Sequence, residues 1–423
     1  MRARLALRSI VCIIAVWTAA LFGYVPGLAL AAGPSPPPTP VGRSHSPSPF
    51  PTVLHTPAPG DEPPRLRSDE ALLEDLDTGQ VLFGQRPSTP RPIASLTKIM
   101  TALLVLERSP LTGEVTVSRN AATTPPSDLG LKAGERISVR DLLYGLLLGS
   151  ANDAAVALAE HVGSSIGGFV TMMNARARQL GMRHTRFRSP NGLDDRGYST
   201  ALDLATLTRA VYQHRAFESI VAAKFHTIPG PGTKVRRVQN RNALLWLYPG
   251  AIGVKTGFTT PAGHCLVAVA QRDGRRLMAV VLHTPSEPFS AGAALFNYGF
   301  VAFERAVLVR AGEGLGPVDV RGRLLPAVAG QSLVALVRRK DLPVLRRRLV
   351  LGAELRAPIK AGQVVGTLAV VDGDRVVGEV PVLAARALGP PGFLEMPPED
   401  LTPAGRTAQA VGILGRSLAD AFL

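Results

Sequence analysis

The stretch PIASLTKIMTALLVLER, residues 92–108, contains the most apolar helix that the sequence predicts and, at its start, two polar side chains. Apolar residues cover most of the circumference of a helix over 95–108, which predicts a helix enclosed by the core on several sides. Ser95 and Lys98 are three residues apart, so on a helix they share one face. The core of the domain is therefore expected to form around this helix and this pair.

The pair Ser95 and Lys98 suggests nucleophilic catalysis. A serine hydroxyl is a weak nucleophile until a neighbouring group takes its proton. An amine can do this when burial or a nearby cation lowers its pKa toward neutrality, and Ile93, Leu96 and Ile99 would supply an apolar setting. A helix-capping serine beside a solvated lysine has the same spacing, so the pair by itself leaves both interpretations open.

A second polar group lies in GSANDAA, residues 149–155, at a break between two predicted helices. Ser150 and Asn152 are one residue apart, and from such a turn a hydroxyl and an amide can both enter a cleft. A pair of helix-capping residues gives the same local pattern. The functional interpretation of this pair is favoured only if other parts of the chain supply a cleft.

A third group lies in VKTGFTT, residues 254–260, on a predicted strand. Lys255, Thr256 and Gly257 offer a cation, a hydroxyl and a residue without a side chain. This combination suits a strand edge along which a peptide docks with its carboxylate held. The alternative is an exposed lysine on an ordinary strand.

The composition narrows the class of protein. The chain has 423 residues and a formal charge of +15, so we expect more than one domain and an affinity for anionic surfaces. Residues 1–31 combine three arginines, an apolar run and an Ala-x-Ala site, which predicts a secretory signal peptide. A permanent membrane anchor is the alternative, and either one argues against nucleic acid as a partner. Cys12 lies in this segment, which leaves Cys265 without an internal partner and predicts a buried packing residue.

The rest of the chain divides by composition and periodicity. Two short strands around a turn at 77–79 and three strands after residue 250, two of them joined at Asp273-Gly274, predict an antiparallel sheet built from both ends of one domain. Ser138 to Asp141 and Thr200 to Asp203 are predicted capping boxes of helices between these strands. The predicted segments are a Pro/Ser-rich disordered tether (32–65), a first domain with helices flanking the sheet (66–305), a small all-β domain (306–388), a spacer (389–404) and an amphipathic helix (405–423).

The order S-x-x-K, S-x-N, K-T-G resembles that of low-molecular-weight penicillin-binding proteins that act as serine-type D-alanyl-D-alanine carboxypeptidases. The resemblance covers about residues 66–390. It is carried by ASLTKIMTALL, LLLGSANDAAVALAEHVG, SPNGLDDRGYSTALDLA, NRNALLW, GVKTGFTTPAGHCLVAVA and APIKAGQVVGTLAVVDGDRVVGEVPVLAA. It implies an α+β fold, with a penicillin-binding/β-lactamase-like domain followed by an all-β domain. It also implies a secreted, membrane-associated enzyme of the cell wall.

Set on these residues, the resemblance implies an acyl-enzyme on Ser95, formed when the enzyme removes the terminal D-alanine of a peptidoglycan stem peptide. Lys98 would take the serine proton. Ser150 and Asn152 would relay protons and hold the substrate amide. Lys255 and Thr256 would bind the terminal carboxylate, beside Gly257, and the N–H groups of Ser95 and Phe258 would form the oxyanion hole. β-Lactams would inhibit by acylating Ser95.

The sequence departs from the family at two places. Ser286 or Glu287 stands where a basic residue is common, and Phe258 where a histidine is common. D,D-endopeptidase activity and a catalytically silent wall-binding protein remain alternatives. A β-lactamase would require a carboxylate for the hydrolytic water, and Asp194 and Asp195 are more typical of a turn. No H-E-x-x-H motif occurs, so neither a metal nor a cofactor is expected.

The final segment predicts a helix that lies on a membrane surface. Val411, Leu414, Leu418 and Phe422 recur at helical spacing, and Arg406 and Arg416 could meet lipid phosphates. The segment is too short and too polar to span a bilayer, but its apolar face could enter the interface. A helix docked on the protein's own surface is the alternative.

Overall fold

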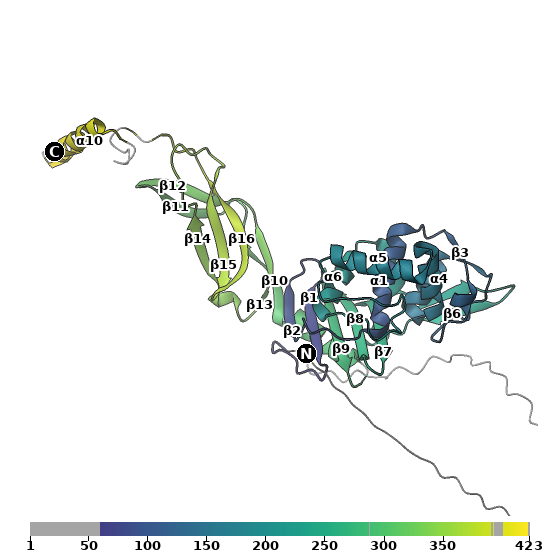
Figure 1. Ribbon diagram of the computed structural model, residues 1–423. Coiled ribbons are helices and arrows are strands. Elements are labelled where there is room, and N and C mark those ends of the chain that lie inside the picture. Colours follow the sequence, from purple (N-terminus) through teal and green to yellow (C-terminus); the bar gives the residue numbers. More distant parts are fainter. Residues whose placement is uncertain (1–59, 287, 391, 393–400, 422–423) are drawn as a thin grey trace, which may run out of the picture. The chain divides into compact units, whose positions relative to one another are not determined.

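The computed structural model describes residues 60–286, 288–390, 392 and 401–421 (Figure 1). The predicted signal peptide lies outside the described residues, together with most of the tether, Glu287, Phe422 and most of the spacer. Of residues 415–421 the backbone alone is described.

The central sheet of the first domain takes strands from both ends of that domain, as the sequence predicts. Its order is β2-β1-β9-β8-β7, and neighbouring strands are antiparallel. The five strands are β1 (Glu70–Asp75), β2 (Val81–Gln85), β7 (Ala251–Thr259), β8 (Gly263–Arg272) and β9 (Arg275–Thr284). The predicted hairpin between β8 and β9 is confirmed: Asp273 and Gly274 have φ of 51° and 73°, the left-handed geometry of a two-residue turn.

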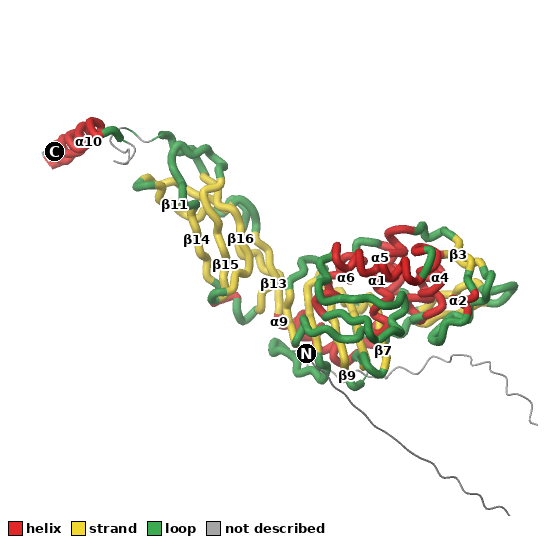
Figure 2. Tube along the Cα trace, viewed as in Figure 1, coloured by secondary structure: helices red, strands yellow, loops and turns green. Residues whose placement is uncertain are grey.

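Both faces of this sheet are buried. Leu72 belongs to a core formed with helices on one face, whereas its neighbours Ala71 and Leu73 belong to a second core on the other face. Successive strand residues point to opposite faces, so a sheet covered on both sides has nearly continuous apolar strands. This explains the uninterrupted run HCLVAVA in β8. Figure 2 shows helices of the first core, α1 and α4–α6, gathered beside the strands.

Most helices of the first domain lie between β2 and β7 in the chain, together with two small hairpins, and α9 follows β9. The helical elements are η1 (Ala94–Thr97, 3₁₀), α1 (Lys98–Arg108), α2 (Arg119–Ala122), α3 (Val139–Tyr144), η2 (Gly145–Gly149, π), α4 (Asn152–Gly163), α5 (Ile166–Gln179), α6 (Ala201–Val211), α7 (Arg215–Ala222), α8 (Leu244–Leu247) and α9 (Phe289–Ala302). The two small hairpins are β3 (Glu114–Thr116) with β4 (Arg136–Ser138), and β5 (Phe225–Pro229) with β6 (Val235–Gln239).

Both predicted capping boxes are confirmed. Ser138 Oγ accepts the N–H of Asp141 at 3.0 Å, and Thr200 Oγ1 accepts the N–H of Asp203 at 3.1 Å. Each bond satisfies one of the free N–H groups of a helix start. The helix that begins at Ser138 continues as a π-helix through Gly149 and ends at Ser150 in left-handed geometry. The end of this helix therefore fixes the position of Ser150.

The second domain is all-β, as predicted. A five-stranded antiparallel sheet has the order β11-β12-β16-β15-β14, and β10 pairs with β13. The strands are β10 (Phe303–Val309), β11 (Gly314–Val320), β12 (Arg323–Ala329), β13 (Leu333–Arg338), β14 (Arg346–Leu351), β15 (Val364–Asp372) and β16 (Arg375–Ala384). Within residues 303–390 the described helical structure is one 3₁₀ turn, η3 (Leu342–Val344). Val318, Leu325 and Val382 lie in its separate core.

A last helix, α10 (Pro403–Ala421), begins close to the predicted start of the terminal helix. Val411 and Leu414 are 65% and 63% exposed, so an apolar stripe of this helix is uncovered. Across the described residues, every helix is either too short or too polar to cross a membrane.

Candidate active site

Ser95 and Lys98 meet at the junction of η1 and α1. Lys98 Nζ lies 2.8 Å from Ser95 Oγ. Ser95 sits in the 3₁₀ turn, and Lys98 opens the α-helix one turn later. The spacing of three residues thus brings the amine within hydrogen-bond distance of the hydroxyl, as the sequence predicts.

Lys98 is fully buried, and its ammonium has two further oxygen partners. Nζ lies 2.8 Å from Asn152 Oδ1 and 2.7 Å from the carbonyl of Asn191. Burial and, to a smaller extent, the positive charge of Arg241 lower the pKa of Lys98 to about 7, while the charge of Asp153 opposes the change. A large fraction of this amine is therefore neutral near pH 7 and can accept a proton.

Two glycines allow the backbone to come close to the Ser95 turn. A Cβ on Gly257 of β7 would lie 3.2 Å from the Ser95 nitrogen and 3.0 Å from the Ile93 carbonyl. Gly192 has φ of +83°, and a Cβ there would lie 1.9 Å from the Ala94 carbonyl. The strand and the loop that carries Asn191 can therefore lie against η1 only because these positions lack side chains.

Ser150 and Asn152 come to the same place from the break between η2 and α4. Ser150 is 5% exposed with φ of 61°. Asn152 Nδ2 donates to the Pro125 carbonyl at 3.0 Å while Oδ1 accepts from Lys98. The orientation of the Asn152 amide is therefore set at both of its ends.

Asp153 holds the loop that covers this break. Its carboxylate accepts the N–H groups of Leu129 at 2.9 Å and Leu131 at 3.1 Å. Burial raises the pKa of Asp153, and these backbone hydrogen bonds oppose that rise. The side chain has a positioning role, because it ties residues 129–131 to the start of α4.

Lys255 lies on β7 and is as deeply buried as Lys98. Its Nζ donates to the carbonyl of Thr256 at 2.7 Å. Burial lowers the pKa of Lys255 well below its ordinary value, and the charges of Lys98 and Arg241 lower it further. The amine is therefore placed to support the β7 backbone beside the site.

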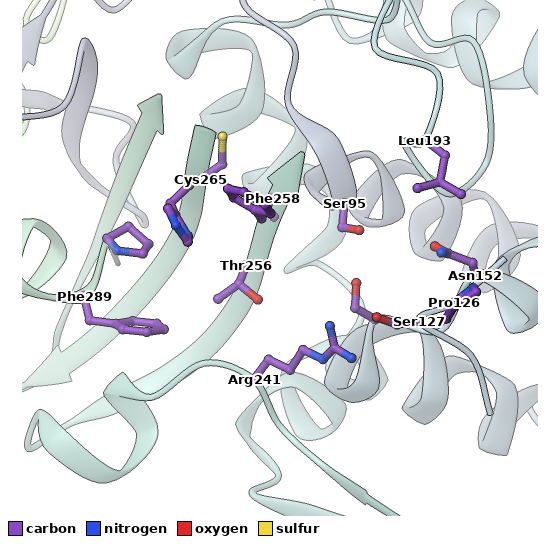
Figure 3. A pocket seen from close by; sticks show the side chains of 14 residues that line it. Ser95, Pro126, Ser127, Asn152, Leu193, Arg241, Thr256, Phe258, Cys265 and Phe289 are labelled. Atoms are coloured by element: carbon purple, nitrogen blue, oxygen red, sulfur yellow. The ribbon is translucent and has the colours of Figure 1, made fainter. Parts of the chain in front are cut away.

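A cavity of about 390 Å³ opens over these groups (Figure 3). In Figure 3, Asn152 and Phe289 lie on opposite sides of the cavity, with Ser95, Thr256 and Phe258 between them, and Ser150 and Gly257 also line it. Its remaining lining residues are Pro126, Ser127, Leu193, Arg241, His264, Cys265, Pro288 and Phe289. The structure thus brings all eight predicted site residues together: six line the cavity, and the two lysines are buried within reach of it.

Two functional groups were missed by the sequence analysis. Arg241 lines the cavity and lowers the pKa of both lysines. It stands in NRNALLW, which contributes to the family resemblance, but the sequence suggested no role for it. Asn191 contributes a backbone carbonyl, which no side-chain pattern reveals. Ser286, at the place expected for a basic residue, is exposed, and Pro288 and Phe289 line the cavity nearby.

The acidic turn residues have structural partners. Asp194 forms an ion pair with Arg196, and Asp195 accepts a hydrogen bond from Thr259 Oγ1 at 2.6 Å. These contacts fit the prediction of a turn. Within the described part of the chain, no three His, Cys, Asp or Glu side chains gather in a way that could hold a metal ion. Cys265 is buried, as predicted.

Two family models match the chain, one for each domain. Residues 58–286 match the family described as D-alanyl-D-alanine carboxypeptidase, peptidase S11. Residues 303–389 match the family described as penicillin-binding protein 5, C-terminal domain. The two matches together span the part of the chain in which the sequence resemblance was found.

Curated relatives and solved structures are similar to this protein over most of its length. The D-alanyl-D-alanine carboxypeptidase DacF of Bacillus subtilis is 30% identical, with 77% of this chain and 86% of that protein covered. DacD of Escherichia coli is 34% identical, covering 78% and 88%. The crystal structure of penicillin-binding protein 5 from Haemophilus influenzae matches with a TM-score of 0.63 at 28% identity, covering 78% of this chain and all of that one.

Proposed function

The chain belongs to the D-alanyl-D-alanine carboxypeptidase family of serine peptidases, and we propose that Ser95 and Lys98 carry out its reaction. It is a penicillin-binding, serine-type D-Ala-D-Ala carboxypeptidase. Members of this family act on peptidoglycan outside the cytoplasm. The assignment of roles to individual residues, given below, is our proposal.

One observation carries the proposal. The Lys98 amine lies 2.8 Å from the Ser95 hydroxyl, and burial lowers its pKa to about 7. A base of this pKa is matched to proton transfer near neutral pH. The carboxylates Asp194 and Asp195 are engaged elsewhere, so this amine is the base nearest to the nucleophile.

In the acylation step, Ser95 Oγ attacks the carbonyl carbon between the two D-alanines while its proton passes to Lys98 Nζ. The N–H groups of Ser95 and Phe258 stabilise the oxyanion that forms. The C–N bond then breaks, and the leaving nitrogen receives the proton from Lys98 through the Ser150 hydroxyl. Free D-alanine departs, and the remaining acyl group is esterified to Ser95.

In the deacylation step, water attacks the ester carbon and gives a proton to Lys98. The C–O bond to Ser95 then breaks, and Lys98 returns that proton to the Ser95 oxygen. Asn152 is held by Lys98 and the Pro125 carbonyl, so its amide can orient the acyl chain through both steps. With a penicillin, the broken C–N bond belongs to a ring. The leaving nitrogen stays attached, so the ester on Ser95 persists.

The resemblance implies that Lys255 and Thr256 bind the terminal carboxylate. Because the Lys255 amine is buried and donates to the Thr256 carbonyl, we propose instead that Thr256 and Arg241 bind it, with Lys255 beneath them. Thr256 and Arg241 line the cavity, whereas Lys255 is 1% exposed and donates to the Thr256 carbonyl. A guanidinium keeps its charge near neutral pH and pairs well with a carboxylate. Arg241 thus supplies the cation that Ser286 and Glu287 do not.

The test combines mass spectrometry with a product assay. The purified chain is treated with penicillin, and the modified peptide is mapped. We expect the adduct on Ser95, and we expect release of D-alanine from a pentapeptide that ends in D-Ala-D-Ala. An adduct on another residue would refute the assignment. Cross-linked wall fragments in the same assay measure endopeptidase activity.

The helix α10 attaches the enzyme to the outer face of the cytoplasmic membrane. Val411 and Leu414, three residues apart, share a face and are largely exposed, and Ile413 widens the stripe. Arg406 and Arg416 add positive charge. Such a helix binds an anionic interface weakly and reversibly.

Vesicle sedimentation tests this attachment. A chain without the signal peptide should sediment with anionic vesicles, and a chain that ends at Thr402 should stay in the supernatant. Leu414→Asp in the longer chain should weaken sedimentation, while Gly412→Ser, which keeps the apolar stripe, should not. Equal behaviour of the longer and shorter chains would rule out the anchor.

A further inference from the structure

The cavity has two chemically different ends (Figure 3). On one side, Ser127, Asn152 and Arg241 bring polar groups to the cavity beside Pro126 and Leu193. The other end, beyond Thr256, is apolar and aromatic. Its lining residues are Phe258, His264, Cys265, Pro288 and Phe289. The proposed reaction uses the polar end and the Ser95 turn, and it leaves the apolar end without an assigned ligand.

Three elements build the apolar end. Phe258 on β7 faces His264 on β8 in register, with ring centroids 4.5 Å apart and an interplanar angle of 36°. Phe289 opens α9 and is 5% exposed, and Cys265 is fully buried. The wall is therefore part of the packed fold. An apolar ligand would meet preformed surface, so little ordering would be lost on binding.

Phe258 is the unusual member of this wall. It is 58% exposed, whereas the other large aromatic side chain at this end is buried. A large apolar side chain left exposed at a cavity rim is a feature of ligand-binding surfaces. The ring of His264 packs against it at a tilt, so the two rings together form a platform.

The strand geometry identifies the part of the substrate that reaches this platform. Thr256 and Phe258 are two residues apart on β7, so their side chains lie on the same face. In the proposed function, Thr256 and Arg241 hold the terminal carboxylate. The side chain of that terminal residue branches from the carbon next to the carboxylate. It therefore lies within reach of Phe258.

We propose that Phe258, His264 and Phe289 form a subsite for the side chain of the C-terminal D-residue, and that this subsite takes apolar side chains larger than the methyl group of alanine. Stem peptides that end in D-Ala-D-Leu, D-Ala-D-Met or D-Ala-D-Phe are then cleaved more efficiently than those that end in D-Ala-D-Ala. The inference rests on the proposed roles of Ser95, Thr256 and Arg241. It adds to them a preference at the leaving residue.

The size of the expected preference follows from the transfer of an apolar side chain from water into the subsite. Each additional methylene in a fitting apolar pocket changes kcat/KM by roughly 10-fold or more. The rim is partly open to solvent, so we expect a smaller gain for a whole side chain. The ratio of kcat/KM for a D-Ala-D-Leu end to that for a D-Ala-D-Ala end should be about 10.

The test measures this ratio for the full chain and for variants, with two pentapeptides that differ only in the last residue. Phe258→Ser should bring the ratio close to 1, and Phe258→Leu, which keeps an apolar side chain, should restore most of it. Phe225→Ala is the matched control, because Phe225 is an exposed aromatic outside the cavity. It should leave the ratio at its original value.

The outcomes separate this inference from the proposed function. A ratio of 1 or less in the unmodified chain, with normal D-alanine release and a penicillin adduct on Ser95, would overturn the subsite alone. A high ratio that Phe258→Ser leaves intact would overturn it too. If D-alanine release and the Ser95 adduct were both missing, the proposed function itself would fail.

Discussion

Lys98 and Lys255 are two buried lysines beside one cavity, and their surroundings differ. Lys98 Nζ contacts the Ser95 hydroxyl, the Asn152 amide oxygen and the Asn191 carbonyl. Lys255 Nζ donates to the carbonyl of Thr256 on its own strand. Burial lowers the pKa of both amines. A lowered pKa is thus insufficient to make a lysine a catalytic base, and contact with the nucleophile distinguishes Lys98.

The largest effect is expected when the Ser95 hydroxyl, which contacts the Lys98 amine, is removed. Ser95→Ala should abolish covalent penicillin labelling and D-alanine release. Of the three oxygens that contact Lys98 Nζ in the described structure, only that of Ser95 belongs to a hydroxyl group. Intact-protein mass spectrometry measures the adduct. Ser127→Ala, which removes another cavity hydroxyl, is the matched control and should still be labelled. Labelling that survives Ser95→Ala would mean that the nucleophile lies elsewhere.

The comparison of the two lysines can be tested by the same substitution at both. Lys98→Met removes the base and should slow acylation by roughly 10²–10⁴-fold. Lys255→Met removes a buried amine that has a backbone partner, so its effect on acylation should be clearly smaller. Stopped-flow acylation by a chromogenic β-lactam measures both rates, and thermal unfolding checks that both variants fold. Equal losses would contradict the distinction drawn between the two sites.

A third prediction compares Arg241 with Lys255 in binding the C-terminal carboxylate of the substrate. Arg241→Ala should lower kcat/KM for a peptide with a free C-terminal carboxylate by roughly 10–100-fold, since hydrogen bonds to charged groups are worth about 1.5–3 kcal/mol. The C-terminal amide of the same peptide should be affected much less. Lys255→Met should reduce both substrates by similar factors. A loss in Arg241→Ala that is equal for acid and amide would remove Arg241 from carboxylate binding.

The smallest effect is the pH dependence of acylation. The neutral Lys98 amine is the active form, and its pKa is about 7. The rate should therefore fall below pH 7, by roughly fivefold between pH 7 and pH 6 if a single group of that pKa controls it, and it should level off above pH 8. A rate that stays flat from pH 6 to 8 would show that this amine does not control the step.

Much of the fold could be predicted from short-range patterns. The strands of the sheet, the capping boxes at Ser138 and Thr200, and the turn at Asp273-Gly274 are all present. Each depends on residues within a few positions of one another. The strand pattern also predicted one sheet built from both ends of the domain, but local patterns do not specify that β1 pairs with β9.

The candidate site was predictable where side chains carry the chemistry in short motifs. Ser95 with Lys98, Ser150 with Asn152, and Lys255 with Thr256 each stand close together in the sequence, and helix or strand periodicity fixes how each pair is presented. The pattern could not show that the three pairs meet. That meeting depends on Gly192 and Gly257, which let two backbones approach the Ser95 turn.

The sequence by itself predicted the elements and paired Ser95, the proposed nucleophile, with its neighbouring amine, because these follow from spacing along the chain. Only the tertiary structure decided that Arg241 lines the cavity beside Ser95 and that the Asn191 carbonyl contacts the Lys98 amine. Both bring together residues far apart in the chain, and the second uses a backbone atom that every residue type possesses. The pKa of Lys98 depends on burial and on the distant charge of Arg241, and both exist only once the chain is folded.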